Sequence, residues 1–270
     1  MFFWEKLLEN PPPHGHVVQL YDENNDRLLT RNVTRYLSEG LKRGDGLLVI
    51  AAREHTEAFD RQLEKMGAQP AAAVRRGRLV FLDAQEMLAK FMVDGQPEWR
   101  RFENTITTVV GALRVRAKET GLRAYGEMVG VLWKQGAFSA AIRLEEFWNK
   151  LLASAGIQLF CAYPIDIFDE EFKATGVDAL LCDHTHLLPS GSNEDIEDAI
   201  NRAVDETLGA RAEQVRLSMK PAPRPSWAVL PGAEALILWI RNNLAEEAEE
   251  ILARARKHYQ RSQQFEPHLS

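Results

Sequence analysis

Short apolar runs alternate with longer amphipathic segments along the first 164 residues of the chain. The short runs are rich in β-branched and aromatic residues and predict strands. These runs are residues 16–21, 46–52, 77–84, 123–126 and 157–164. The last of them, IQLFCAYP, is almost wholly apolar, which is typical of a strand buried on both faces of a parallel sheet.

The segments between these runs place apolar residues three or four positions apart, which predicts amphipathic helices. The expected helices are residues 27–41, 53–67, 85–95, 98–120 and 133–152. Helices that alternate with strands in this way predict an α/β fold of three layers, with a mainly parallel sheet covered by helices on both faces. Ligands of such sheets bind outside the carboxyl ends of the strands. The candidate positions are therefore Tyr21, Asp22, Arg53 to His55, Asp83, Glu127, Met128 and Tyr163 to Asp166.

The pattern changes after Asp166. Residues 166–176 predict a short helix, and Ser192 with Asp195 forms a capping-box signature for a helix over 194–217. A proline-rich linker at 221–226 precedes Pro231, which suits the first turn of a last helix over 232–259. We therefore expect an N-terminal segment at 1–13, an α/β domain at 14–189 and a helical C-terminal extension at 190–270. The last helix must bury one apolar stripe, against the domain or against a copy of itself in a homodimer.

The composition and charge of the chain argue against several classes of function. The chain has 270 residues, a net charge of −6 and no dense cluster of lysine and arginine, so direct nucleic-acid binding is not expected. No apolar run approaches the ~20 residues of a membrane-spanning helix, and the first ten residues lack a secretory signal. Together with two cysteines expected to be reduced thiols, Cys161 and Cys182, this predicts a cytoplasmic protein that contacts no membrane.

The chemistry of a nucleotide hydrolase has little support. The segment YDENND at 21–26 follows the first strand, but it has no glycine, no lysine and three acidic side chains, which would repel a triphosphate. There is no G-x-S-x-G motif, and Cys161 lies within a strand, where a thiol is usually inert. We interpret His16 and His55 as structural rather than catalytic. The sequence therefore predicts a protein that is not an enzyme and has no cofactor.

Two groups of polar residues could form sites. Cys182, His184 and His186 alternate in CDHTH and could bind zinc, although a polar loop is the favoured interpretation because no second ligand pair lies nearby. The second group is Glu127, Arg143, Glu146 and Trp148. It predicts either an internal ion-pair network that locks a helix to the sheet, or a small pocket with apolar walls formed by Met128, Trp133 and Trp148.

Several long segments resemble the MEDS family, the sensory domain named for methanogen and methylotroph proteins and the regulator of dichloromethane degradation. The segments are HVVQLYDENND and its continuation to His55, GRLVFLDAQEMLAKFMVDG at 77–95, RAYGEMVGVLWKQGAFSAAIRLEEFWNKL at 123–151, LFCAYP at 159–164 and HTHLLP at 184–189. The resemblance implies a RecA/KaiC-like domain that has lost its phosphate loop and senses small molecules, often hydrocarbon derivatives. The family's recurrent positions match His16, Tyr21, His55, Asp83, Glu127, Trp133, Arg143, Glu146, Trp148 and Tyr163.

These observations together predict a non-enzymatic sensory or regulatory protein. We expect it to bind a small molecule or a signalling partner at the carboxyl edge of the sheet, through the recurrent residues other than Asp83, together with Met128. Residues 190–270 carry no kinase signature and no clear helix-turn-helix, so we expect the output to be a protein contact made by this tail. Two alternatives remain open: a degenerate nucleotide-binding protein with little or no ATPase activity, and a structural interaction module.

Overall fold

The computed structural model describes residues 3–12, 14–117, 121–173, 176, 183–219 and 230–265. The chain forms two units. The first consists of Met1–Pro164 and Asp183–Thr185, and the second of Ile165–Cys182 and His186–Ser270. The N-terminal segment therefore belongs to the first unit, and the chain leaves that unit at Pro164 before returning to it briefly.

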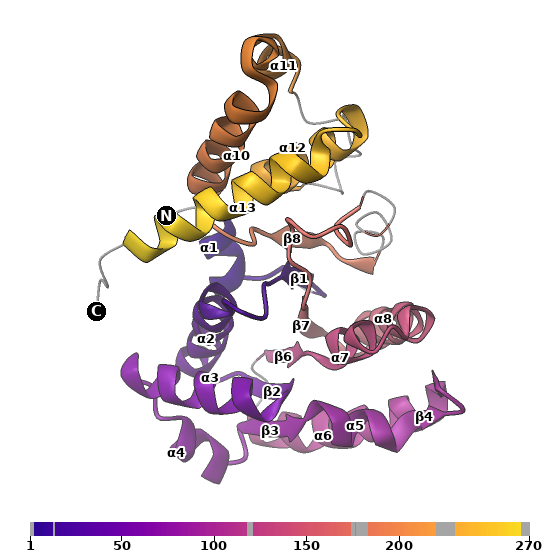
Figure 1. The fold of residues 1–270 in the computed structure, drawn as a ribbon. Helices are drawn as coiled ribbons and strands as arrows, with labels where there is room; N and C mark the ends of the chain where they lie inside the picture. Colours follow the sequence, from indigo (N-terminus) through magenta and orange to yellow (C-terminus); the bar gives the residue numbers. More distant parts are fainter. Residues whose placement is uncertain are drawn as a thin grey trace. The chain divides into compact units, whose positions relative to one another are not determined.

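The first unit is built on a parallel sheet with the strand order β3-β2-β6-β7-β1 (Figure 1). Every neighbouring pair among these strands is parallel, as the apolar runs predicted. The strands are β1 (His16–Leu20), β2 (Gly46–Ala51), β3 (Leu79–Asp83), β6 (Leu122–Gly126) and β7 (Ile157–Tyr163). All residues of β1, β2 and β6 are buried, which agrees with strands covered on both faces.

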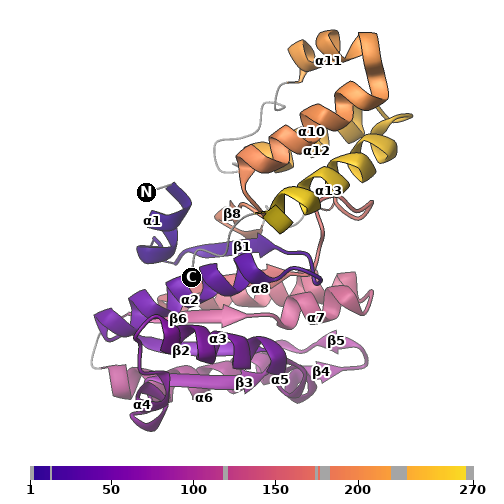
Figure 2. The same cartoon turned by 60° about the vertical axis from the view of Figure 1, so that its left-hand side comes forward.

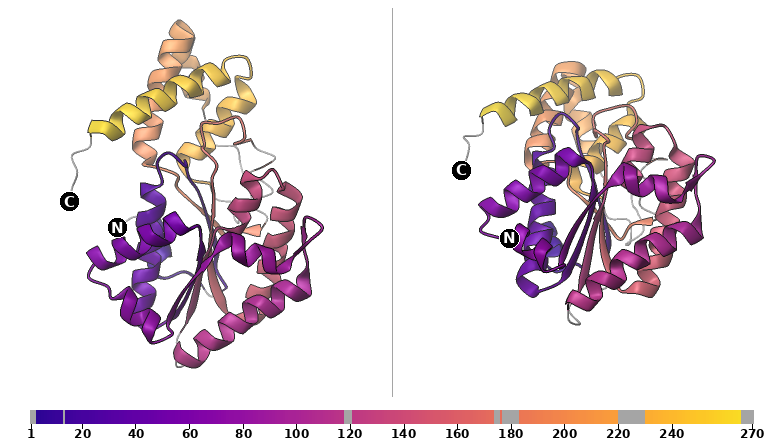
Figure 3. Two further views of the ribbon diagram at one scale, coloured as in Figure 1. Left: turned by 60° about the horizontal axis from the view of Figure 1, so that its bottom comes forward. Right: turned by 90° about the horizontal axis from the view of Figure 1, so that it is seen from below.

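Helices cover both faces of this sheet, which confirms the predicted three layers; Figure 3 shows the purple helices on one side of the strands and the magenta helices on the other. On the first face, Tyr36 and Phe59 pack their rings against Phe160 and Tyr125 of the sheet. On the second face, the helices also pack on each other, as Phe102 does on Trp148 with ring centroids 5.1 Å apart. The helices of this unit are α1 (Phe3–Glu9), α2 (Arg27–Arg43), α3 (Arg53–Lys65), α4 (Pro70–Arg75), α5 (Ala84–Phe91), α6 (Trp99–Ala117), α7 (Met128–Lys134) and α8 (Phe138–Ala155).

Strand register decides which polar side chains share a face. Tyr125 of β6 is paired with Phe160 of β7, and Gly126 with Cys161. Because successive residues of a strand point to opposite faces, Tyr125 and Phe160 face α2 and α3, whereas Cys161 faces the side of α8. The two faces of the sheet therefore carry separate polar groups.

Several helix boundaries differ from the sequence prediction. The expected helix over 133–152 is two helices, because Gly136 adopts a φ of 73° and ends α7. The expected helix over 85–95 ends at Phe91. It is followed by a small hairpin of β4 (Met92–Val93) and β5 (Gln96–Pro97), in whose turn Gly95 has a φ of 75°. Asp83 caps α5, since its carboxylate accepts a hydrogen bond from the backbone N–H of Glu86.

The second unit contains β8 (His186–Leu188), α10 (Asn193–Leu208), a 3₁₀ turn at Gly209–Arg211, α11 (Ala212–Ser218), α12 (Gly232–Asn243) and α13 (Ala248–Phe265). The predicted continuous helix over 194–217 is wrong, because Gly209 has a φ of 51° and a ψ of −120° that an α-helix does not contain. The predicted helix over 232–259 is also interrupted. Asn242 and Asn243 are weak helix formers, and the side chain of Asn243 bonds to the carbonyl of Trp239 where the chain turns.

Of the remaining sequence predictions for this unit, the cap of α10 is confirmed and the short helix after Asp166 is not. Ser192 caps α10 by accepting a hydrogen bond from the N–H of Asp195, as predicted. Residues 166–173 form turns at 167–171 and no helix, in place of the expected short helix, and residues 174–175 and the predicted linker at 221–226 lie outside the described residues. The apolar stripe of α13 packs along α10 (Figure 2), and its members Ile251, Leu252 and Ala255 are buried. Within the described part of the chain, none of the helices combines the length and the apolar character needed to cross a bilayer.

Candidate functional site

The carboxyl ends of three strands bring together a polar group that we call the edge cluster: Tyr21, Asp26, His55, Tyr125 and Glu127. Glu127 directly follows β6, His55 lies in the first turn of α3 after β2, and Asp26 ends the loop after β1. His55 bridges the other two: its Nδ1 lies 2.6 Å from Glu127 Oε1 and its Nε2 lies 3.1 Å from Asp26 Oδ2. The imidazole thus joins the loop after β1 to the end of β6.

Glu127 is the buried anchor of the edge cluster, with 3% of its surface exposed. Its carboxylate accepts a hydrogen bond from the backbone N–H of Ala52 at 2.8 Å and one from the hydroxyl of Tyr125 at 2.7 Å. Burial, reinforced by the charge of Glu127, raises the pKa of Tyr125 well above its usual value. The tyrosine therefore stays protonated and remains a donor to this carboxylate. A buried carboxylate with three donors is held in one orientation.

The two carboxylates beside His55 favour the charged form of its imidazole. Burial lowers the pKa of an imidazole, but the hydrogen bonds and charges of Glu127 and Asp26 outweigh burial and raise the pKa of His55 above 6.5. Aromatic contacts also hold the orientation of the His55 ring. It stacks on Phe59 with ring centroids 5.8 Å apart and makes an edge-to-face contact with Tyr21. The cluster therefore holds the imidazole of His55 between two carboxylates at the rim of the sheet.

This charge state predicts a pH-dependent contribution to stability. Because the pKa of His55 is raised on folding, its contribution is fully present below about pH 6.5, the unfolded pKa, and is lost as the pH rises through the folded pKa. We expect the difference in unfolding free energy between the wild type and His55→Gln to shrink steadily above about pH 6.5. Urea unfolding of both proteins across this pH range measures the difference. A difference that is constant with pH would contradict a raised pKa of His55.

The loop after β1 is closed by its own hydrogen bonds. The carboxylate of Asp22 accepts from the backbone N–H and the side-chain amide of Asn24, and the N–H of Asn25 donates to the carbonyl of Asp22. Together with the acidic side chains of this segment, these bonds leave an unsuitable surface for a phosphate group, which needs converging free N–H groups. That this loop does not bind a triphosphate stays a prediction from its sequence.

The opposite face of the sheet carries a second polar group, which we call the buried cluster: His16, Glu145, Cys161, Tyr163 and His184. His16 begins β1, Cys161 and Tyr163 belong to β7, Glu145 lies on α8, and His184 lies in the returning segment Asp183–Thr185. Glu145 is at its centre: Oε2 is 3.4 Å from His16 Nε2, and Oε1 is 3.2 Å from His184 Nε2. The hydroxyl of Tyr163 donates to Oε1 at 2.6 Å.

The electrostatics of the buried cluster follow from this packing. Burial and the neighbouring His184 lower the pKa of His16 to about 4, so its imidazole is neutral at pH 7. Burial alone would raise the pKa of Glu145, but the two histidines and the hydroxyl of Tyr163 hold it at about 2. Burial and the charge of Glu145 raise the pKa of the Cys161 thiol well above its usual value. The cluster therefore contains one buried carboxylate surrounded by neutral or cationic partners.

The structure separates the group predicted around Glu127. Arg143 and Glu146 lie on the exposed side of α8, and Arg143 stacks over Phe147 rather than meeting Glu127. Glu145, next to Glu146, is the residue of this helix that points inward, with 1% of its surface exposed. The predicted buried ion-pair network between Glu127, Arg143 and Glu146 therefore does not form, because helical geometry turns both α8 residues away from the sheet.

The remaining predicted residues line the second face of the sheet. Met128 and Trp148 are buried, and Trp148 packs on Phe102. Trp133 is half-buried in α7 and meets Tyr163 edge-on, with ring centroids 5.5 Å apart. Of the metal candidates, Cys182 lies outside the described residues, His184 belongs to the buried cluster, and His186 is a half-buried residue of the second unit.

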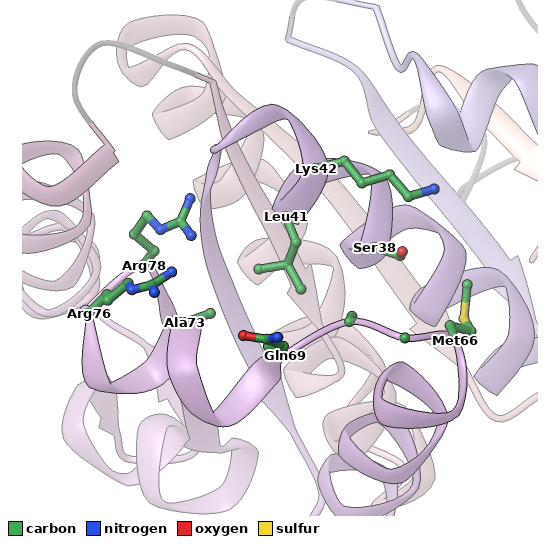
Figure 4. Close-up of a pocket in the computed structure, with 10 residues that line it drawn as sticks. Ser38, Leu41, Lys42, Met66, Gln69, Ala73, Arg76 and Arg78 are labelled. Atoms are coloured by element: carbon green, nitrogen blue, oxygen red, sulfur yellow. The ribbon is translucent and has the colours of Figure 1, made fainter.

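A pocket of about 230 Å³ lies at the other edge of the sheet (Figure 4). It is formed by the end of α2, the α3–α4 connection and α4, and it includes Arg78, which directly precedes β3. Because these segments adjoin the amino ends of the strands, the pocket is on the edge opposite to Glu127 and His55. None of the predicted ligand-binding residues lines it.

Sequence reasoning missed several members of both clusters. Asp26 occupies the N-cap position of α2, but its side chain makes no cap hydrogen bond and binds His55 instead. Glu145 carried a usable signal, because it follows Ala141 by four positions and precedes Trp148 by three, within the apolar stripe of its helix. Tyr125 and Cys161 carried none, since a polar group inside a buried strand does not reveal its partner.

Comparison with known proteins identifies one family. The sequence profile described as MEDS, the methanogen/methylotroph, DcmR sensory domain, matches residues 15–185. This match covers most of the first unit, including both clusters and the returning segment Asp183–Thr185. A comparison with curated proteins finds no match.

Proposed function

Because the chain belongs to the MEDS family of sensory domains, we propose that it is a sensory or regulatory protein whose ligand-responsive group is the edge cluster. The observation that carries the proposal is the imidazole of His55, held between Glu127 and Asp26 at the carboxyl edge of a parallel sheet. This edge is where ligands of such sheets bind, and residues with shifted pKa values concentrate at functional sites. The proposal involves no catalysed reaction.

The ligand in this proposal is a small, weakly polar organic molecule with a hydrogen-bond acceptor. The two bonds of His55 differ in accessibility: the side chain of Glu127 is 5% exposed, whereas that of Asp26 is 40% exposed. The outer bond, from Nε2–H to Asp26, is therefore the one that a ligand oxygen can replace. The inner bond to Glu127 keeps the imidazole oriented while the exchange takes place.

Asp26 supplies the second state that a sensor needs. It occupies the N-cap position of α2, but its side chain makes no capping bond while it is held by His55. Aspartate is among the preferred N-cap residues because its carboxylate accepts from the free N–H groups of the first turn. A ligand that displaces Asp26 from His55 would allow it to cap α2, and the loop at 22–26 would change shape. A ligand biases such a pair of states by its differential affinity for them.

Thermal unfolding of the full chain tests the proposal. Methanol and a series of short-chain alcohols and aldehydes are the probes, because they carry an oxygen acceptor and the family takes its name from methanogens and methylotrophs. We expect at least one probe to raise the melting temperature saturably, since binding to the folded state stabilises it. The rise is expected to disappear in His55→Gln and to persist in Arg143→Gln, whose side chain lies on the exposed side of α8.

Two outcomes would contradict the proposal: no probe shifts the melting temperature, or a shift is equal in the wild type and in His55→Gln. ATP with Mg²⁺ forms a separate arm of the same experiment. A saturable shift with ATP alone would favour the nucleotide-binding alternative. No feature of the closed, acidic loop at 22–26 supports that alternative.

A further inference from the structure

Four side chains of metal-ligand type converge in the buried cluster from four separate segments. They are His16 of β1, Glu145 of α8, Cys161 of β7 and His184 of the returning segment, and one ligand atom of each lies within 4.8 Å of all the others. All four residues are buried, with at most 4% of their surface exposed. We propose that these four residues form a binding site for a divalent transition-metal ion of the zinc type. The site is independent of the proposed function, which rests on the edge cluster.

The distances between the ligand atoms suit one bound ion. Zinc bonds of about 2.0–2.3 Å in a tetrahedron place the ligand atoms roughly 3.3–3.6 Å apart. In the buried cluster, His16 Nε2 lies 3.2 Å from Cys161 Sγ and 3.4 Å from Glu145 Oε2. Glu145 Oε1 lies 3.2 Å from His184 Nε2, and Glu145 Oε2 lies 3.9 Å from Cys161 Sγ. The short contacts use both carboxylate oxygens of Glu145, and the four ligand atoms, one from each residue, lie within 4.8 Å of one another, so they must draw closer together to coordinate one ion.

A second layer of hydrogen bonds orients the ligands. Nδ1 of His16 lies 2.8 Å from the side-chain oxygen of Asn149, and the amide of Asn149 donates to Asp183 at 3.0 Å. A proton on Nδ1 donated to Asn149 leaves the lone pair of Nε2 directed at Glu145 and Cys161. Tyr163 fixes Glu145 in the same way through its hydroxyl. Metal-binding histidines and carboxylates are regularly held by such outer partners.

A bound cation also stabilises the electron-rich atoms that converge at the centre of the buried cluster. With the proton on Nδ1, Nε2 of His16 is an acceptor that lies 3.2 Å from the thiol of Cys161 and 3.4 Å from the carboxylate of Glu145. A divalent ion binds all three of them, and its charge is balanced by one carboxylate and one thiolate, so that the buried site is neutral overall. Binding releases the thiol proton of Cys161 to solvent, as it does whenever cysteine ligates a metal.

The ligand set indicates the kind of ion and its role. Imidazole and thiolate ligands suit zinc and its borderline neighbours, whereas magnesium and calcium prefer oxygen. Four protein ligands complete a tetrahedron and leave no position for a substrate or a water molecule, so the ion would be structural rather than catalytic. It would bind the returning segment at His184 to the strands through His16 and Cys161.

The site differs from the linear Cys182, His184 and His186 motif, and this difference provides a matched control. We expect the full chain, purified without chelators, to contain about one zinc-type ion per molecule by elemental analysis. Cys161→Ser should lose it, with metal content falling at least about tenfold, whereas Cys182→Ser should keep it. Asn149→Ala removes an orienting partner rather than a ligand, and we expect it to weaken metal affinity about 10–100-fold.

Cobalt substitution reports directly whether a thiolate ligates the metal. Co²⁺ added to metal-free wild type and to Cys182→Ser should produce the near-ultraviolet charge-transfer band of a cobalt–thiolate bond. The same band should be absent from Cys161→Ser, whose folding is checked by circular dichroism. The proposal is overturned if the purified chain carries no transition metal and neither Zn²⁺ nor Co²⁺ binds on titration. It is also overturned if the metal follows Cys182 instead of Cys161.

Discussion

Replacing Arg123 by methionine is expected to lower the free energy of unfolding of the first unit by about 3–5 kcal/mol. Arg123 lies in β6 with 1% of its surface exposed, and its guanidinium donates to Asp45 Oδ2 at 2.9 Å. It also donates to the backbone carbonyls of Leu8, Tyr36 and Glu9. Methionine fills a similar volume but leaves the buried carboxylate of Asp45 and three carbonyls without this donor.

Two further variants separate the loss of these bonds from a general effect of substitution. Arg61→Met removes an arginine whose side chain is 67% exposed, and it should change stability by at most about 0.5 kcal/mol. Adding Asp45→Asn to Arg123→Met neutralises the orphaned carboxylate and should recover part of the loss, because the two residues act as a pair. Urea unfolding followed by tryptophan fluorescence gives all the values. A loss below about 1 kcal/mol for Arg123→Met would contradict the assigned role.

Replacing Glu127 by alanine is expected to lower the free energy of unfolding by a similar amount, about 3–5 kcal/mol. The substitution leaves the N–H of Ala52, the hydroxyl of Tyr125 and the imidazole of His55 without their common acceptor. It also leaves a cavity at the end of β6 where the carboxylate was buried. Urea unfolding of Glu127→Ala and of the wild type at pH 6 and at pH 8 gives the difference.

Glu127→Gln is the matched control for this second prediction. Glutamine keeps the shape and one acceptor oxygen, but its NH₂ group opposes a donor and its neutral amide no longer stabilises the charge on His55. We expect a smaller loss of about 1–2 kcal/mol, with the pKa of His55 lowered relative to the wild type. If Glu127→Ala and Glu127→Gln cost the same, or if neither changes stability, the carboxylate is not the anchor of the edge cluster.

The strands and the layers of the first unit follow from local sequence patterns. Apolar runs such as GLLVIA in β2 and IQLFCAY in β7 have no competing interpretation, because they are short, rich in β-formers and flanked by amphipathic segments. The predicted secondary structure is wrong where an element is very short, or where one residue interrupts an otherwise regular apolar spacing. β4 and β5 have two residues each, and Gly136 and Gly209 divide segments whose apolar spacing alone predicts continuous helices.

The clusters depend on strand order and register, which no local pattern contains. Both His55 and Glu127 could be selected as candidates because each follows a strand. Their contact requires β2 to lie beside β6, although β3 separates these strands along the chain. The buried cluster depends on contacts between residues even further apart in the sequence, since His16 and His184 come from opposite ends of the first unit. Only the pairing of β1 with β7 places His16 near Cys161. Glu145 was distinguishable from Glu146 by its position in the apolar stripe.

Nuclear magnetic resonance of His55 in the full chain tests the sensory proposal most directly. The imidazole Cε1–H signal, assigned by comparison with His55→Gln, reports both the bond to Asp26 and the protonation state of the ring. The proposal predicts that a probe that raises the melting temperature also moves this signal saturably, with the same dissociation constant, and that Asp26→Ala already shifts it towards the ligand-bound position. A bound probe that leaves the His55 signal unmoved would contradict the edge cluster as the ligand-responsive group.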